Sequence, residues 1–338
     1  MRSTQEINQP SPRGLRAGGR SRAPTGTRML ALLGAGLLTL ALSACSLPLA
    51  TRLESATPSA TPTSLPPTPT LSPTPTATAS ATPTVTATPT ITPTPIILRP
   101  PEGEPFVIGY SVEGRPLWVT RFGSGPVVRL ILGGIHGGYE WNTVDLVEGL
   151  IQDFHQGTLL VPPDVTLYIL RNLNPDGYEN YWGQYAGRSN ANGVDLNRNW
   201  DANWQPTWPL EGCFSAVTLT GGTAPFSEPE TQALAQFLLD YEVDALVSYH
   251  SQMSAIYATG DETLDPAADD LARGLAAASG YQYPPPWSSC VYTGQLVDWA
   301  VDQGIAAVTV ELTTHDDPDL ALNRRLVNAF LAWRRPAP

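Results

Sequence analysis

A run rich in proline and threonine divides this chain of 338 residues at positions 56–95. The run holds 11 Pro and 15 Thr, and no charged residue occurs between Glu54 and Arg99. Its apolar side chains are too sparse to offset the entropy lost on ordering, and proline-rich chain favours extended polyproline geometry. We predict a disordered stalk over residues 45–98, so a folded domain has to be built from residues 99–338, which are enough for one substantial core.

The N-terminal segment has the pattern of an export signal. Residues 1–28 carry six Arg and one Glu, and Met29 to Leu42 is an apolar run of 14 residues that leads into Leu-Ser-Ala-Cys, ending at Cys45. A membrane-spanning helix needs about 20 apolar residues, so this run is too short to be one. We predict a lipoprotein signal peptide over residues 1–44, lipid attachment at Cys45, and a mature chain anchored to the outer face of a bacterial cell membrane.

The charge balance and the remaining cysteines describe the exported part. Residues 1–44 contribute five net positive charges, so their removal changes the net charge from −12 to −17, which disfavours nucleic acid as a partner. The chain has no Lys, and every basic residue is an Arg.

Disulfides persist outside the cell, and one bridge between Cys213 and Cys290 is the simplest pairing. Two separate buried thiols remain the alternative, because a sequence gives no distance between them.

The C-terminal domain alternates apolar strands with amphipathic helices. This pattern predicts an α/β fold with a single mixed, largely parallel sheet and helices on both faces. The expected strands are 127–135, 165–171, 245–249 and 306–312, and the expected helices are 142–154, 228–241, 295–303 and 320–333. Ligands of open α/β sheets bind beyond the carboxyl ends of the strands. Polar residues that follow these strands should therefore meet at one edge.

Three of those polar residues have the side chains of a zinc site. His136 follows the first strand and two glycines, Glu140 begins the next helix, and His250 ends a later strand. Considered alone, Glu140 could complement the dipole of its helix, and either histidine could be a satisfied core residue. Together, two imidazoles and one carboxylate form an open catalytic zinc site with room for water. We predict one Zn²⁺ per chain, bound by His136, Glu140 and His250.

At this point the chain resembles the M14 family of zinc carboxypeptidases, over almost all of residues 106–335. The resemblance includes, in order, IGYSVEGRP at 108–116, GGIHGGYEWNT at 133–143, NPDGY at 174–178, GVDLNRNW at 193–200, FSEPET at 226–231, SYHS at 248–251 and TVEL at 309–312. It implies a carboxypeptidase-like fold, a bound zinc ion, and substrates that are peptides with a free C-terminal carboxylate.

The same resemblance assigns roles to further residues. Glu311 would be the general base, which takes a proton from water and passes it to the leaving amine, while zinc lowers the pKa of water toward about 7 and polarises the scissile carbonyl. Asn197 and Arg198 would bind the terminal carboxylate of the substrate. Arg188 would stabilise the oxyanion, although a surface ion pair is an alternative for it. Asp195 would orient the first zinc histidine.

Some residues depart from the family pattern. Three residues separate His136 from Glu140, where the family has two, which puts the geometry of the zinc site in question. The expected position of the family's mobile tyrosine falls near Cys290, so Tyr292 could replace it as a substrate-binding residue only if the loop is rearranged. We expect His155 and His315 to be solvated, and Asp176 of NPDGY to take part in turn formation.

These residues predict a metallocarboxypeptidase that hydrolyses C-terminal residues from peptides, with cell-wall peptides as candidate substrates by family analogy. By the same resemblance, Val297 lies where the family often sets side-chain preference, and it suggests no strong selection for charge. One alternative is a zinc-dependent deacylase of small N-acyl amino acids, and another is a non-catalytic surface lipoprotein that binds peptides. An intact Glu311 argues against the second alternative.

Overall fold

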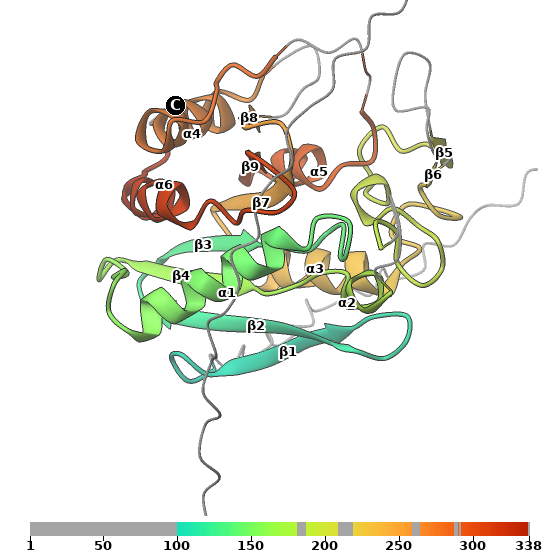
Figure 1. The fold of residues 1–338 in the computed structure, drawn as a ribbon, viewed down its shortest axis with the longest axis horizontal. Helices are drawn as coiled ribbons and strands as arrows, with labels where there is room; N and C mark the ends of the chain where they lie inside the picture. Colours follow the sequence, from blue (N-terminus) through green and yellow to red (C-terminus); the bar gives the residue numbers. More distant parts are fainter. Residues whose placement is uncertain are drawn as a thin grey trace, which may run out of the picture. The chain divides into compact units, whose positions relative to one another are not determined.

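A seven-stranded mixed sheet is the centre of the fold in this computed structural model, which describes residues 100–180, 187–208, 219–258, 264–286, 290 and 292–336 (Figure 1). The order of the strands across the sheet is β1-β2-β4-β3-β7-β9-β8. These strands are β1 (Pro105–Tyr110), β2 (Pro116–Gly123), β3 (Val127–Leu132), β4 (Val165–Leu170), β7 (Ala245–Ser251), β8 (Ala255–Ala258) and β9 (Ala306–Leu312). The predicted signal peptide, the predicted lipid-attachment residue Cys45, the predicted stalk and Cys213 lie outside the described residues.

The middle of the sheet is parallel and its edges are antiparallel. Strands β4, β3, β7 and β9 pair in parallel, whereas β1, β2 and β8 join them in antiparallel pairs. The carboxyl ends of the four parallel strands therefore meet at one edge, which is the edge where ligands of such sheets bind. Two short strands, β5 (Thr207–Trp208) and β6 (Leu219–Thr220), form a separate antiparallel pair.

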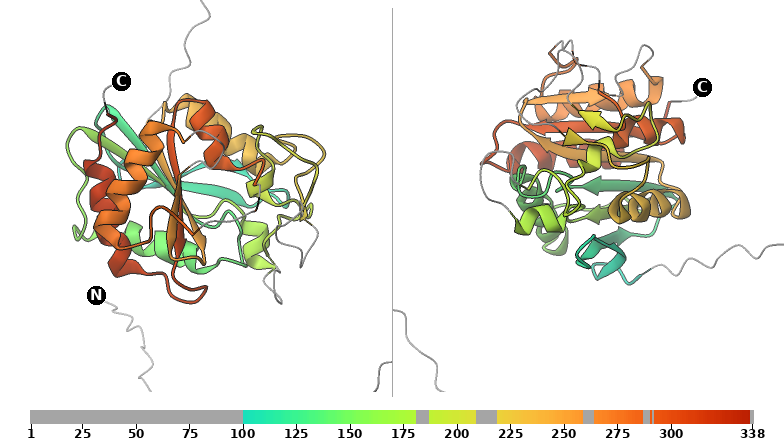
Figure 2. Two further views of the ribbon diagram at one scale, coloured as in Figure 1. Left: turned by 90° about the horizontal axis from the view of Figure 1, so that it is seen from above. Right: turned by 90° about the vertical axis from the view of Figure 1, so that its right-hand side faces the viewer.

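Helices cover both faces of the sheet, as Figures 1 and 2 show. One face packs against α1 (Asn142–His155), α4 (Pro266–Ser279) and α6 (Leu320–Ala332), and the other against α3 (Pro229–Asp240) and α5 (Leu296–Asp302). Successive side chains of a strand point to opposite faces, so Ile131 of β3 belongs to the first core, and its neighbours Leu130 and Leu132 belong to the second. The predicted α/β fold with helices on both faces is confirmed.

Most predicted elements differ from the observed ones only at their ends. Strand β9 has the predicted bounds, β3 ends at Leu132 instead of residue 135, and β7 runs to Ser251, so that His250 lies within the strand. A short helix, α2 (Pro175–Glu179), and the hairpin β1–β2 were not predicted. None of the helices in the described residues combines the length and the apolar character that crossing a bilayer requires.

Candidate active site

Two histidines and a glutamate meet beyond the carboxyl ends of β3 and β7. The chain leaves β3 through glycines to His136, Glu140 lies just before α1, and His250 is near the end of β7. His136 Nδ1 is 2.8 Å from Glu140 Oε1, and His250 Nδ1 is 3.1 Å from Glu140 Oε2. One ligand atom from each residue lies within 4.8 Å of the others, and all three side chains are buried.

A tight glycine turn accommodates the extra residue between His136 and Glu140. Gly137 has a φ of +37°, and a Cβ added there would lie only 2.7 Å from the carbonyl oxygen of Asn174. The backbone N–H groups of Tyr139 and Glu140 both donate to the carbonyl of His136, at 3.0 and 3.3 Å. Because the turn folds back in this way, the longer spacing still brings the carboxylate to both histidines.

Asp195 fixes the orientation of the His136 ring. Its Oδ1 lies 3.0 Å from His136 Nε2, and its Oδ2 accepts from Arg188 Nε at 2.9 Å. Burial by itself would raise the pKa of Asp195, but Arg188 and then His136 hold that pKa well below its usual range. An ionised Asp195 can only accept, so His136 donates through Nε2 and its Nδ1 lone pair faces Glu140.

This arrangement fits a bound cation. The His136 Nδ1 lone pair faces a carboxylate oxygen at 2.8 Å, and buried Glu140 Oε2, 3.1 Å from His250 Nδ1, accepts no hydrogen bond from the described residues. Burial would raise the pKa of Glu140, but the two histidines outweigh burial and lower it. Ionised carboxylate and imidazole lone pairs that face one another need a positive charge between them, and two histidines with one carboxylate suit zinc.

Glu311 lies on the other side of His250. It is the register partner of His250 in the parallel pair of β7 with β9. Its Oε2 is buried and accepts no hydrogen bond from the described residues. Burial raises the pKa of Glu311 to about 7, an effect that His250 opposes and Glu140 reinforces. A carboxylate with such a pKa can exchange protons near neutral pH.

Asn197 and Arg198 come from a short 3-10 turn, Leu196–Arg198, that Asp195 caps by accepting from the N–H of Asn197 at 2.9 Å. The side-chain oxygen of Asn197 accepts from the backbone N–H of Leu296 at 3.0 Å, which fixes this amide against α5. The Arg198 guanidinium lies 5.3 Å from the centre of the Tyr292 ring. Burial, together with nearby Arg188, lowers the pKa of Arg198, as expected for a cation held ready for an anion.

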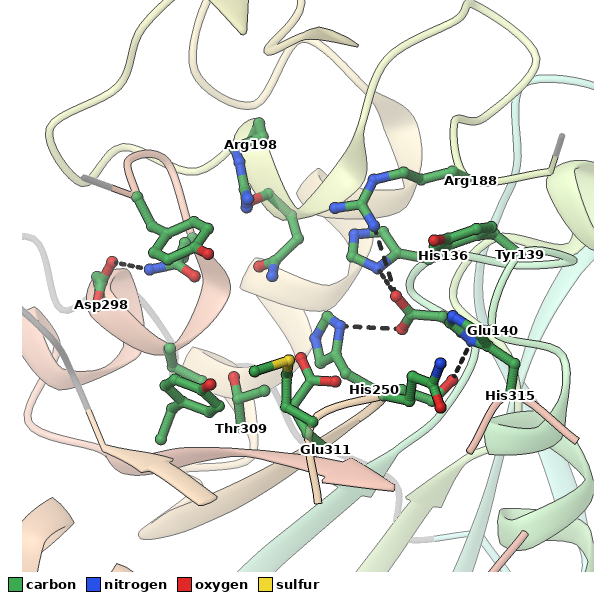
Figure 3. Close-up of a pocket in the computed structure, with 18 of the residues that line it drawn as sticks. His136, Tyr139, Glu140, Arg188, Arg198, His250, Asp298, Thr309, Glu311 and His315 are labelled. Atoms are coloured by element: carbon green, nitrogen blue, oxygen red, sulfur yellow. Dashed lines mark hydrogen bonds and ion pairs between the residues drawn. The ribbon is translucent and has the colours of Figure 1, made fainter. Parts of the chain in front are cut away.

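A cavity of about 560 Å³ joins these groups (Figure 3). Its lining includes the predicted site residues His136, Glu140, Arg188, Asn197, Arg198, His250, Tyr292 and Glu311, together with Val297. Further lining residues that the sequence interpretation did not single out are Tyr139, Ser251, Gln252, Met253, Tyr257, Ala258, Pro286, Gln295, Asp298 and Thr309. Ser251, Gln252 and Met253 directly follow His250, and Thr309 lies two positions before Glu311, and that proximity was the available signal for these four.

One sequence interpretation was wrong. His315 is not a solvated loop residue, because it lines the cavity, bonds to Ser251 and packs on the Tyr139 ring. Buried Asp176 supports the turn between β1 and β2, because its carboxylate accepts from the Ser111 hydroxyl at 2.7 Å and from the backbone N–H of Glu113 at 3.0 Å. His155 is exposed, as expected.

The predicted disulfide is tested only in part. Cys290 is disulfide-bonded. Its proposed partner, Cys213, is outside the described residues, so the pairing of the two stays a prediction.

The strand ends of this α/β sheet bring a zinc triad, a titratable glutamate and a buried arginine into one cavity. These features define the class of the protein as a zinc-dependent hydrolase. Comparisons with known proteins narrow this class. The sequence model of the family described as zinc carboxypeptidase matches residues 100–326. Murein peptide amidase A of Escherichia coli strain K12 is 32% identical over 220 residues, which cover 63% of this chain and 81% of the amidase.

Further relatives agree. Carboxypeptidase A1 of Sus scrofa is 31% identical over 232 residues, which cover 59% of this chain and 54% of that protein. The crystal structure of murein-tripeptide amidase from Escherichia coli O157 superposes with a TM-score of 0.52 at 28% identity, covering 70% of this chain and 94% of the amidase. The chain belongs to the M14 family of zinc carboxypeptidases, and it is a zinc-dependent peptide hydrolase.

Proposed function

We propose that this enzyme is an exported, lipid-anchored carboxypeptidase that acts on cell-wall peptides, with Glu311 as its general base. The observation that carries the proposal is one cavity that is lined both by the zinc triad and by buried Arg198, which lies to one side of the triad (Figure 3). Such a cavity suits a peptide whose terminal carboxylate is fixed at one end and whose remaining chain leaves at the other.

The residues divide the chemistry among them. Asn197 and Arg198 bind the free C-terminal carboxylate, which places the last peptide bond at the centre. Glu311 takes a proton from the attacking water and passes it to the leaving amine. Arg188, 3.5 Å from Glu140 Oε1, supplies positive charge where the oxyanion develops. Zinc held by His136, Glu140 and His250 would polarise the scissile carbonyl and acidify water.

Cell-wall peptides are the favoured substrates because of the named relatives. Murein peptide amidase A aligns with this chain over most of its own length, and a murein-tripeptide amidase shares its fold. The cavity also carries polar groups where the leaving residue would lie, including Tyr257, Asp298 and Thr309. A polar leaving residue would find hydrogen-bond partners there, which an apolar pocket would lack.

The test uses the purified protein with a mixed set of L-peptides and murein stem peptides, read by mass spectrometry. We expect one zinc per chain and stepwise loss of C-terminal residues from peptides with a free carboxylate. Equal rates for peptides with an amidated C-terminus would exclude an exopeptidase. Hydrolysis of N-acyl amino acids without hydrolysis of longer peptides would favour the deacylase.

The proposed location rests on residues 1–45 and needs its own test. We expect radiolabelled palmitate to enter the protein in bacterial cells and a Cys45→Ser variant to incorporate none. Fractionation of the cells should find the wild-type protein with the membrane. Recovery of unlabelled wild-type protein in the soluble fraction would contradict lipid anchoring.

A further inference from the structure

His315 occupies a defined place in the cavity. It follows β9 and lines the cavity, and its ring centre is 4.9 Å from that of Tyr139. Figure 3 shows His315 and Tyr139 on one side of Glu140, with Arg198 and Asp298 on the opposite side. If Arg198 binds the terminal carboxylate, as the proposed function holds, His315 lies beside the acyl part of the substrate, the part that precedes the scissile bond.

The orientation of one buried amide determines the hydrogen bonds around His315. Asn142, fully buried at the start of α1, donates through Nδ2 to the carbonyl oxygens of Thr314 and Asp317, at 2.7 and 3.0 Å. Carbonyl oxygens only accept, so Nδ2 must face them and Oδ1 must face the other way. The Asn142 Oδ1 atom is therefore an acceptor presented to Ser251.

Ser251 links the Asn142 oxygen to the imidazole of His315. Its hydroxyl donates to Asn142 Oδ1 at 3.0 Å, and the same oxygen lies 2.9 Å from His315 Nδ1. A hydroxyl has one proton, so the oxygen of Ser251 can only accept from Nδ1. His315 therefore carries a proton on Nδ1, and in its neutral form Nε2 has a lone pair.

The Nε2 atom is available to a ligand. Nδ1 faces Ser251, so Nε2 lies on the other side of the ring, and within the described ranges no protein group hydrogen-bonds to it. The loop that carries His315 is also held in place, because the backbone N–H groups of Asp316 and Asp317 donate to the Thr314 hydroxyl at 3.2 and 2.9 Å. An acceptor that is fixed before binding costs little entropy when it engages a ligand.

We propose that His315 is a specificity-determining residue, which accepts through Nε2 a hydrogen bond from the N–H of the residue that precedes the scissile bond. A peptide chain that extends from Arg198 past the centre has to present N–H donors on this side, and a buried donor left without an acceptor weakens binding. His315 thereby favours peptides over substrates that lack this N–H, such as N-acyl amino acids.

The experiment compares an N-acetylated dipeptide with an analogue in which oxygen replaces the N–H of its first residue. For the wild-type enzyme we expect the replacement to reduce kcat/KM roughly three- to tenfold, the worth of one hydrogen bond. His315→Ala should lose the same factor on the dipeptide and show no further loss on the analogue. The control His155→Ala, an exposed histidine at the end of α1, should behave as wild type. Equal losses of His315→Ala on both substrates would overturn the proposal.

A binding experiment distinguishes a failure of this inference from a failure of the proposed function. The zinc-loaded Glu311→Gln protein, with and without His315→Ala, can be titrated with both compounds by calorimetry, which needs no turnover. A dipeptide preference that vanishes in the His315→Ala background supports the inference even if the wild-type enzyme hydrolyses neither compound, a result that would refute only the proposed function. No preference in Kd would refute the inference.

Nitrogen-15 NMR of neutral His315 should show a protonated Nδ1 and a bare Nε2, and the reverse would remove the acceptor.

Discussion

The two glutamates of the centre, Glu140 and Glu311, both lie beside His250 and are held in opposite ways. Both oxygens of Glu140 have close partners: His136 and His250 face them, and Arg188 pairs with both Glu140 and Asp195. Both glutamates have a buried oxygen without a hydrogen bond, but Glu311 makes no ion pair in the described part of the chain. The surroundings of Glu140 hold its charge in place, whereas Glu311 is able to gain and lose a proton.

The pKa values of the two sides follow this difference. The two histidines lower the pKa of Glu140, and Arg188 and His136 lower that of Asp195, in both cases against the effect of burial. Burial dominates at Glu311 and raises its pKa to about 7. The same side-chain type therefore serves as a permanent anion on one side of His250 and as a candidate base on the other.

The same substitution on each side tests this contrast most strongly. In Glu311→Gln we expect kcat/KM to fall by about 10²- to 10⁴-fold, because the general base is lost, while zinc stays bound. In Glu140→Gln we expect zinc itself to be lost, because a neutral amide replaces an anionic ligand. Steady-state kinetics and metal analysis of each purified variant give the two readouts.

The same two variants can also contradict the contrast between Glu140 and Glu311. Retained hydrolysis in Glu311→Gln would show that the base is another residue. Loss of zinc from Glu311→Gln to the same extent as from Glu140→Gln would remove the distinction between the two sides. Thermal unfolding of the metal-free variants shows whether either protein has merely failed to fold.

Asp195, which orients the zinc ligand His136, can be changed without changing a zinc ligand itself. In Asp195→Asn we expect zinc affinity to fall about 10- to 100-fold, because His136 loses the anion that sets its ring orientation. Asp298→Asn is the matched control, since Asp298 lines the same cavity but accepts from Gln295 at 2.8 Å. Competition with a chelator measures both affinities. Equal affinity of the two variants would mean that Asp195 contributes only to folding.

Arg198 extends the contrast to the substrate, because this cation is buried and lines the cavity. Arg198→Ala should lower kcat/KM for peptides with a free carboxylate roughly 10- to 100-fold, mostly through KM, since a charge-assisted hydrogen bond is lost. The same peptides with an amidated C-terminus are the control and should be hydrolysed equally by both proteins. Identical losses on both peptide series would show that Arg198 supports the structure instead of binding the carboxylate.

The fold could be predicted from the sequence where local pattern decides it. Strand β9 has its predicted bounds because its apolar run is buried on both faces. Helix α4 was missed although Asp265 caps it, Pro266 begins it and Gly280 follows it with a φ of +92°, all of which are readable signals. Strands β1 and β2 contain Pro and Gly, which weaken the strand pattern, and they form through pairing with each other and with β4.

The site could be predicted where one short motif carries both the residue and its chemistry. His136, Glu140 and Glu311 were found in this way, and the structure brings them to one cavity. His315 could not be found, because its contacts come from Ser251 and Asn142, residues of two other elements that only the folded chain places beside it. Its sequence neighbours, Asp316 and Asp317, are exposed and suggest an ordinary surface loop.

The pH profile offers the smallest and sharpest test of the contrast between the two glutamates. Only ionised Glu311 can act as a base, so kcat/KM should fall about tenfold per pH unit below the pKa of this residue. Burial places that pKa at about 7, and a bound zinc cation favours the ionised carboxylate, so the acid limb of the loaded enzyme should lie at or below pH 7. Glu140 and Asp195, whose pKa values are lowered, should stay ionised across this range and keep zinc bound. Metal analysis at each pH checks this retention, and the residual activity of Glu311→Gln should lack the acid limb. An unchanged limb in that variant would assign it to another group, and the two glutamates would then no longer differ in their titration.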